Sequence, residues 1–198
     1  MPRRWLAVGA AVAVLIGLAA VVIGGDLAPS LSGSDPAPPK PSATDPPGFV
    51  RFRDAAVGLS IAHPSGWRRH ASPDSQVRLL AEHEGASVLV RIAPLGLAVV
   101  PETVGAARQI TDKLVRAAGE IKLLRRPRRV KLGGLSGYLY LYKFRDPRTK
   151  QKAAHAHYFL FRGENMITLV FQAVPADRFV EFAPLFDRIA ASLRGQGA

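Results

Sequence analysis

Residues 137–144, with the sequence GYLYLYKF, alternate between aromatic and other side chains. Because successive side chains of a β-strand point to opposite faces of the sheet, this alternation predicts a strand with one aromatic face. That face carries Tyr138, Tyr140, Tyr142 and Phe144. Two more strand patterns follow at 153–161 and 166–174, with a turn at 163–165 between them. Connections this short predict an antiparallel meander of three strands.

The rest of the folded part combines short strands with two helices. Strand patterns occupy 49–53, 58–63, 77–81, 87–92, 121–124 and 128–132. Between Pro101 and Gly119 apolar residues recur at spacings of three and four, which predicts a helix. A second helical stripe runs from Phe179 to Leu193, and Pro184 is expected to split it, so that the last regular helix begins there. This order predicts an α+β fold in which packed helices cover an antiparallel β-sheet.

The segment GLSIAHPSGWRR, residues 58–69, ends a strand in a turn that leads to Trp67. A strand ending in Pro-x-Gly-Trp near the domain start, a long central helix, a meander and a closing helix (LFDRIAASLR, 185–194) together resemble the PsbP-like fold. The chain is similar, over residues 49–194, to the LpqN-type envelope proteins of actinobacteria and to related extracytoplasmic sensor domains. The resemblance implies an α/β sandwich without catalytic function, which serves the bacterial cell envelope as an accessory or binding module.

An apolar run of 19 residues extends from Trp5 to Ile23, and Arg3 and Arg4 precede it. As a helix it would span roughly 28 Å, close to the ~30 Å hydrocarbon core of a bilayer. Residues 1–25 are therefore interpreted as a cytoplasmic N-terminus and a single-pass transmembrane signal-anchor in the cell membrane. The two arginines keep the N-terminus inside, so the C-terminal domain is expected to be extracytoplasmic. A cleaved signal peptide is the alternative.

Residues 26–47 have a composition that cannot form a core. Seven of these 22 residues are proline, four are serine and none is aromatic, which predicts an extended spacer. The extracytoplasmic α+β domain is expected over residues 48–198. LpqN-type proteins are usually held at the membrane by a lipidated cysteine. This chain has no cysteine, so the resemblance implies that a transmembrane anchor replaces the lipid.

The chain is strongly basic, with 27 Lys and Arg against 15 Asp and Glu and a net charge of +12 at pH 7. Eleven of the basic residues lie between positions 121 and 152, where Asp146 is the one acid. The densest group, here called the basic cluster, consists of Arg125, Arg126, Arg128, Arg129 and Lys131. Outside the cytoplasm this cluster is predicted to bind anionic lipid or wall polymers, and nucleic acid is not an expected partner. The alternatives are a solvated sheet edge and the arginine bias of a GC-rich genome.

The sequence contains few groups that could support catalysis. The absence of cysteine excludes disulfides, thiol catalysis and cysteine–zinc sites. His155 and His157 share a strand face and form a weak candidate metal pair, but the spacing places no third ligand beside them, and we expect them near the surface. The segment GLSG at 134–137 lacks the second spacer of a nucleophile elbow. No cofactor is expected. A metal-dependent or hydrolytic envelope enzyme that uses the two histidines is the alternative function.

The tyrosine row at 138, 140 and 142 has two interpretations. If exposed, Tyr138, Tyr140 and Tyr142 form an aromatic patch that could stack on sugars or bases, or contact an envelope protein partner. If buried, they form the sheet face that a helix covers, with their hydroxyl groups reaching the rim. A sandwich needs such a face, so the buried interpretation is preferred.

Overall fold

The computed structural model describes residues 45–100 and 102–195. Its strands are β1 (Phe49–Asp54), β2 (Leu59–Pro64), β3 (Arg68–Arg69), β4 (Val77–His83), β5 (Ala86–Val99), β6 (Ile121–Leu123), β7 (Arg128–Leu132), β8 (Leu135–Arg145), β9 (Lys152–Ala173) and β10 (Arg194–Gly195). Its helices are α1 (Val104–Ala117), the 3₁₀ turn η1 (Ala176–Arg178) and α2 (Phe179–Ala191). The strands form a small sheet, β1–β2–β10, and a large sheet, β3–β4–β5–β9–β8–β6, with β7 also paired to β8. All pairings are antiparallel.

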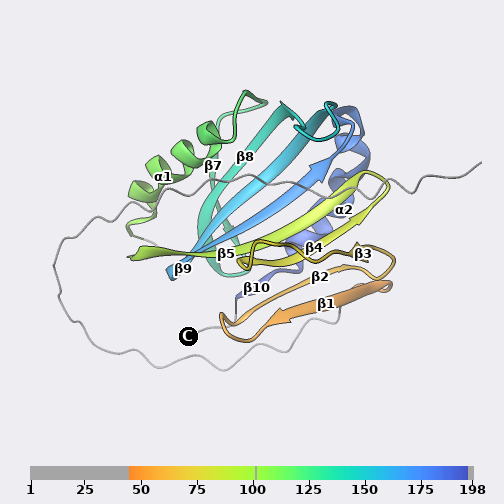
Figure 1. Cartoon of the computed structure of the whole chain (residues 1–198). Helices are drawn as coiled ribbons and strands as arrows, with labels where there is room; N and C mark the ends of the chain where they lie inside the picture. Colours follow the sequence, from red (N-terminus) through yellow and green to blue (C-terminus); the bar gives the residue numbers. More distant parts are fainter. Residues whose placement is uncertain (1–44, 101, 196–198) are drawn as a thin grey trace, which may run out of the picture.

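Strand β9 folds back on itself and supplies two arms to the large sheet (Figure 1). Arm 152–161 pairs with β8, and arm 163–173 pairs with β5. His155 Nε2 lies 2.6 Å from Gln172 Oε1, although 17 residues of straight strand would separate them by about 56 Å. The chain reverses near Gly163, whose φ of 53° favours glycine. The predicted meander is therefore confirmed.

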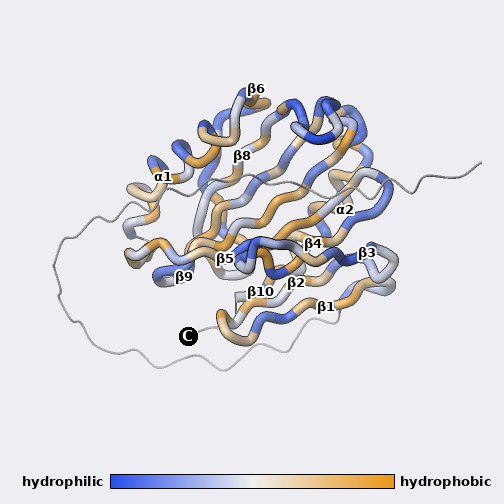
Figure 2. The backbone as a smooth tube through the Cα atoms, in the orientation of Figure 1, coloured by the Kyte–Doolittle hydropathy of each residue, from blue (hydrophilic) through white to orange (hydrophobic). Residues whose placement is uncertain are grey.

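The two helices lie on opposite faces of the large sheet (Figure 1). Helix α1 packs on an aromatic face that includes Tyr140 and Phe159. Helix α2 and the small sheet cover the other face, where Ile189 and Leu193 are fully buried. Figure 2 shows apolar residues along the sheet interior and a hydrophilic connection between β8 and β9. The predicted architecture, an antiparallel sheet with packed helices, is confirmed.

The turn after β2 brings Trp67 into the core, as the sequence predicts. The backbone N–H of Trp67 donates to the Pro64 carbonyl at 3.1 Å, which closes the turn. The indole is 7% exposed and belongs to the core cluster beneath α2. The Pro-Ser-Gly-Trp segment thus acts as a structural element that joins the small sheet to the main core.

The prediction that the last helix begins at Pro184 is wrong. Helix α2 begins at Phe179 and runs through the proline. The rings of Phe179 and Phe182 lie 5.5 and 5.9 Å from the ring of Phe186, and this packing holds the first turn in place. Proline removes only the bond to the carbonyl of Val180, a residue that is 80% exposed, so water can satisfy that carbonyl.

Two other element boundaries differ from the predicted ones. Helix α1 begins at Val104 rather than at Pro101, which lies outside the described residues. Strand β5 extends to Val99, well past the predicted 87–92, because its far end pairs with Gly163 after a break in register. Both differences lie at the connection between β5 and α1. There the pairing of β5 with the distant strand β9 extends the strand beyond the local sequence pattern.

Among the described residues, no helix is both long and apolar enough to cross a membrane. The apolar run at 5–23 and the spacer up to residue 44 lie outside the described residues, so the signal-anchor stays a prediction.

Ser192 joins the end of α2 to β2. Its Oγ accepts the Ala62 N–H at 2.8 Å and donates to the Ile189 carbonyl at 2.6 Å. Because Ser192→Ala leaves the buried N–H without this acceptor, we expect a loss of about 1–3 kcal/mol in the free energy of unfolding, measured in urea. Ser65→Ala is the control, since the Ser65 hydroxyl is exposed and donates to the Gly48 carbonyl at 3.1 Å. Equal effects of the two substitutions would contradict this role of Ser192.

Candidate functional site

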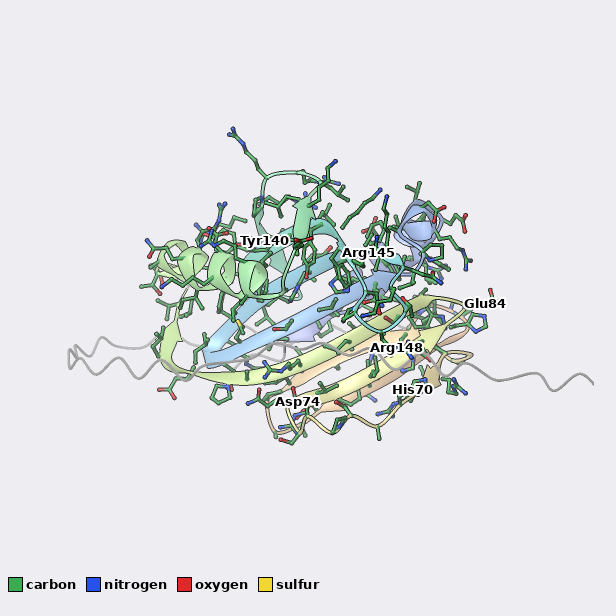
Figure 3. The ribbon with its side chains drawn as sticks, turned by 45° about the horizontal axis from the view of Figure 1, so that its top comes forward. His70, Asp74, Glu84, Tyr140, Arg145 and Arg148 are labelled. Carbon is green, nitrogen blue, oxygen red and sulfur yellow. The ribbon has the colours of Figure 1, made fainter. Side chains whose placement is uncertain are left out.

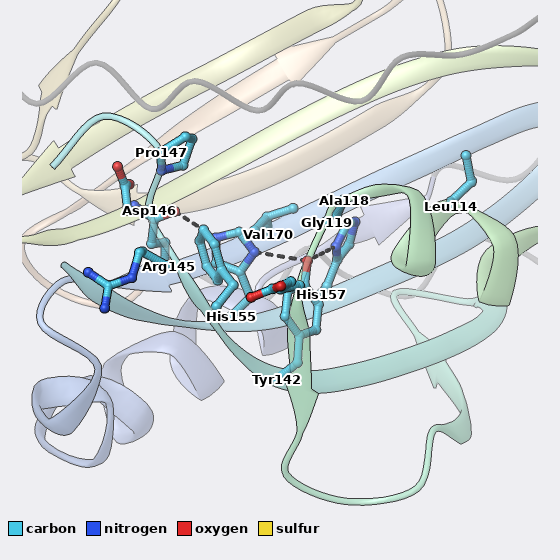
Figure 4. Close-up of a pocket in the computed structure, with 13 residues that line it drawn as sticks. Leu114, Ala118, Gly119, Tyr142, Arg145, Asp146, Pro147, His155, His157 and Val170 are labelled. Carbon is cyan, nitrogen blue, oxygen red and sulfur yellow. Dashed lines mark hydrogen bonds between the residues drawn. The ribbon is translucent and has the colours of Figure 1, made fainter. Parts of the chain in front are cut away.

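A cavity of about 280 Å³ lies between the C-terminal end of α1 and the sheet (Figure 4). Helix α1 and the segment after it contribute Leu114, Ala118 and Gly119 to its lining. Strand β8 and the connection after it contribute Tyr142, Phe144 and Pro147, and the arms of β9 contribute His155, His157, Val170 and Gln172. The cavity therefore combines apolar walls with a compact group of buried polar side chains, and Glu120, Arg145 and Asp146 complete its lining.

The fold brings these polar side chains together through strand register. Tyr142 of β8 is directly opposite His155 of the first β9 arm. Gln172 of the second arm reaches the same histidine. His157 is two residues further along the first arm, so its side chain emerges on the same face. The alternation of three neighbouring strands is enough to assemble the group.

Tyr142 bridges the two histidines. Its hydroxyl oxygen lies 3.0 Å from Nδ1 of His155 and 3.0 Å from Nδ1 of His157, as the dashed lines in Figure 4 show. His155 Nε2 lies 2.6 Å from the amide oxygen of Gln172. The hydrogen bonds therefore form one continuous chain of four side chains, from Gln172 to His157.

This chain fixes where the protons are in the neutral state. An amide oxygen only accepts, so Nε2 of His155 carries the proton and its Nδ1 accepts from the Tyr142 hydroxyl. The tyrosine oxygen then accepts from Nδ1–H of His157. Nε2 of His157 is left with a free lone pair, and among the described residues this buried atom has no hydrogen-bond partner.

Burial keeps both histidines neutral. It lowers the pKa of His155 to about 4, against the opposing effects of the Gln172 hydrogen bond and the Asp146 charge. Burial, assisted by His155, lowers the pKa of His157 well below its ordinary value. Burial also raises the pKa of the Tyr142 hydroxyl. At neutral pH the group is a set of uncharged donors and acceptors rather than a charged site.

The histidines are not near the surface, contrary to the sequence-based expectation. His155 and His157 are 7% and 4% exposed, because the end of α1 and the connection at 146–147 lie over this part of the strand. The Tyr142 hydroxyl already occupies one ring nitrogen of each histidine. No group of three His, Cys, Asp or Glu within residues 45–100 and 102–195 could hold a metal ion.

The tyrosine row lies under α1. Tyr138, Tyr140 and Tyr142 are 6%, 1% and 2% exposed, so their rings form no surface patch. The Tyr140 hydroxyl donates to Asp112 at 2.5 Å, and it lies 2.7 Å from the Thr111 hydroxyl. Burial, and the bond to the carboxylate, raise the pKa of Tyr140 to about 12. Figure 3 shows Tyr140 beside the helix, which is the arrangement of the preferred interpretation.

The basic cluster lies along one edge of the large sheet. Strands β6 and β7 pair with different parts of β8, and the cluster occupies β7 and the connection before it. All five side chains are exposed. Val130 and Leu132 pack against the core beneath α2, so the alternation of β7 directs Arg128 to that face and Lys131 to the other. The cluster therefore surrounds the edge rather than covering one face.

Two features of these sites are not predicted by the sequence. Leu123 and Leu124, within a predicted strand, are 45% and 48% exposed directly beside Arg125. A short strand pattern gives no signal of exposure, because exposure depends on which elements cover it. Gln172 was also missed as the partner of His155. Its register across the predicted turn could have identified it, since residues 155 and 172 lie nine and eight positions from the turn centre at residue 164.

Compared by sequence, the chain matches no family model and no curated protein. Its fold is similar to that of cyanobacterial PsbP (CyanoP) from Synechocystis sp. PCC 6803, with 16% identity, a TM-score of 0.50, and coverage of 75% of this chain and 93% of that chain. A protein from Bacteroides thetaiotaomicron has 12% identity and a TM-score of 0.51, over 74% of this chain and 48% of that one. LpqN of Mycobacterium tuberculosis, described as involved in cell envelope biogenesis, has 9% identity and a TM-score of 0.47, over 74% and 89%. At these identities the first two superpositions show the fold alone, and that fold is PsbP-like.

Proposed function

We propose that this protein is a membrane-anchored, extracytoplasmic accessory module of the cell envelope, without catalytic function, that binds anionic membrane surfaces through its basic cluster. The observation that supports this most is the position of the cluster. Five exposed cations lie on one sheet edge, and the exposed side chains of Leu123 and Leu124 adjoin them. Cations with neighbouring apolar side chains match the interface of a bilayer, where headgroup charge meets hydrocarbon.

The sequence between positions 121 and 152 is predominantly basic. Asp146, the one acid between positions 121 and 152, is 6% exposed. Its carboxylate accepts hydrogen bonds from the backbone N–H groups of Arg148 and Thr149, at 2.9 and 2.8 Å. These bonds stabilise the turn that follows β8. Arg145 at the end of β8 and Arg148 in the connection between β8 and β9, both labelled in Figure 3, add positive charge to this region. A surface with this excess of positive charge favours an anionic partner.

The expected N-terminal anchor and spacer fit this function. A fully extended spacer of 22 residues reaches at most about 68 Å at ~3.1 Å per residue. That reach lets a domain on the outer side return to the membrane that holds its own anchor. The spacer then supplies a high local concentration, so that a weak surface interaction is sufficient.

Replacement of the whole basic cluster by glutamine tests the proposal. All three core clusters consist of residues between Phe49 and Leu193, so residues 45–198 can be used without the apolar run. Each cation near an anionic surface contributes ~1 kcal/mol, so we expect binding to anionic vesicles to weaken at least tenfold. Binding is measured by flotation with anionic and with neutral vesicles. Binding should weaken as the salt concentration is raised, because dissolved ions screen the interaction between surface charges.

A matched control removes the same charge elsewhere. The control variant carries glutamine at five other exposed basic positions: Arg53, Arg68, Arg78, Lys113 and Arg116. It has the same net charge as the cluster variant, and it should keep most of the binding. If both variants lose binding equally, net charge rather than the cluster is responsible. If unmodified protein binds neutral and anionic vesicles alike, the proposal is wrong.

A further inference from the structure

The buried hydrogen-bond chain ends in an acceptor that the protein does not use. Nε2 of His157 is buried and has no hydrogen-bond partner among the described residues. The His157 ring is 4% exposed and stacks on Phe159, with ring centroids 4.0 Å apart, so it cannot turn toward solvent. Leaving a buried acceptor unpaired costs about 1–3 kcal/mol. The same ring lines the cavity, from which a partner can reach it.

The cavity walls restrict the chemistry of that partner. Leu114, Phe144 and Val170 provide apolar surface, and the Phe144 ring lies 4.3 Å from the ring of His155. An apolar cavity of ~150 Å³ holds a benzene molecule. A volume of about 280 Å³ therefore suits one ring with small substituents.

The cavity is also lined by Glu120, Arg145 and Asp146, but the side chains that are hydrogen-bonded around His157 carry no charge. Both histidines are neutral at physiological pH, since burial lowers the pKa of each. Tyr142 and Gln172 are also uncharged, and they are already engaged with the histidines. None of the four side chains of the hydrogen-bond chain is a cation that could pair with an anion at Nε2 of His157. What the lone pair requires is an O–H or N–H donor.

We infer that this cavity is a binding site for a small, neutral, mainly apolar ring compound that donates one O–H or N–H hydrogen bond to Nε2 of His157. The site is separate from the basic cluster and goes beyond the function proposed above. The ligand completes the chain of hydrogen bonds that begins at Gln172. The Tyr142 hydroxyl holds the imidazole in the tautomer that accepts, and is thus a positioning group for the acceptor.

The test uses the full chain with ¹⁵N-labelled histidine, in lipid nanodiscs, with phenol and toluene as probes. The two compounds have similar size, but only phenol donates a hydrogen bond. We expect a proton on Nε2 of His155 and on Nδ1 of His157 before addition. Phenol should shift the Nε2 resonance of His157 saturably, whereas toluene should shift it far less. No saturable shift with phenol, or equal shifts with both compounds, would overturn the inference.

Two neighbouring alanines provide matched variants that leave the hydrogen-bond chain intact. Ala118 lines the cavity and is exposed, whereas Ala117, one residue earlier, is exposed and lies outside the lining. Ala118→Phe should abolish the phenol shift by filling the cavity, and Ala117→Phe should retain it. A phenol shift that survives Ala118→Phe would place binding elsewhere and overturn the inference. The glutamine variant of the basic cluster should respond to phenol normally, so the two proposals can fail separately.

Discussion

Gly137→Ala is expected to prevent stable folding of the domain. Gly137 lies in β8, between Val130 of β7 and Leu160 of the first β9 arm. A Cβ atom added there would be 1.9 Å from the carbonyl oxygen of Phe159 and 2.9 Å from Cα of Leu160. Both are backbone atoms, so no side chain can move aside. The strands must separate, and we expect a loss of more than ~3 kcal/mol out of the ~5–15 kcal/mol that usually stabilises a domain.

Urea unfolding of residues 45–198 measures this effect. Trp67 is the one tryptophan of that segment and is buried, so its fluorescence reports the core. Gly66→Ala is the control, because a Cβ atom at Gly66 would meet nothing within 4 Å. We expect that control to change the free energy of unfolding by less than about 0.5 kcal/mol. Near-native stability of Gly137→Ala would show that the β8–β9 pairing is wrong.

Acidification from pH 7 to pH 4.5 is expected to destabilise the domain by about 2 kcal/mol through His155 alone. Burial lowers the pKa of this histidine from 6.5 in the unfolded chain to about 4 in the folded one. Between these values the unfolded state binds a proton that the folded state does not, so stability falls as pH falls. Each unit of difference in pKa between the folded and unfolded states corresponds to ~1.4 kcal/mol in the free energy of unfolding. His157 and His63, whose pKa values burial also lowers, act in the same direction.

The control for this prediction is an exposed histidine. The side chain of His83 is 55% exposed, so His83→Gln removes a histidine that is not buried, and it should change the difference in stability between pH 7 and pH 4.5 less than His155→Gln does. His155→Gln should reduce that difference by about 2 kcal/mol or more, even if it is less stable at pH 7. The comparison uses urea unfolding at both pH values. An unchanged pH dependence in His155→Gln would contradict the neutral, buried state of this histidine.

Local periodicity was sufficient for the framework of the fold. The alternation at 137–144 identified β8 and its aromatic face, and the turn at 163–165 identified the reversal of β9. The proline and glycine around Ser65 predicted the turn that carries Trp67 inward. In each case the signal is the order of residues that are neighbours in the sequence, which does not depend on any distant contact.

Features that depend on distant contacts could not be predicted. Pro184 is tolerated inside α2 because phenylalanines before and after it pack together. His155 is buried because the end of α1 and the connection after β8 lie over a strand face that looked accessible. Leu124 is exposed because no element covers it. Coverage by a remote segment leaves no trace in the local pattern, and both candidate sites depend on it.

The most direct test of the proposed function is the environment of residue 124 at a membrane. The chain has no cysteine, so Leu124→Cys provides a single site for an environment-sensitive fluorophore. Val180→Cys, on α2 and 80% exposed, is the matched control. With the full chain in vesicles, we predict that the label at 124 enters an apolar environment in anionic but not in neutral lipid, while the label at 180 stays in water. A label at 124 that stays in water in both lipids, or equal changes at 124 and 180, would contradict the binding of the basic cluster to anionic membranes.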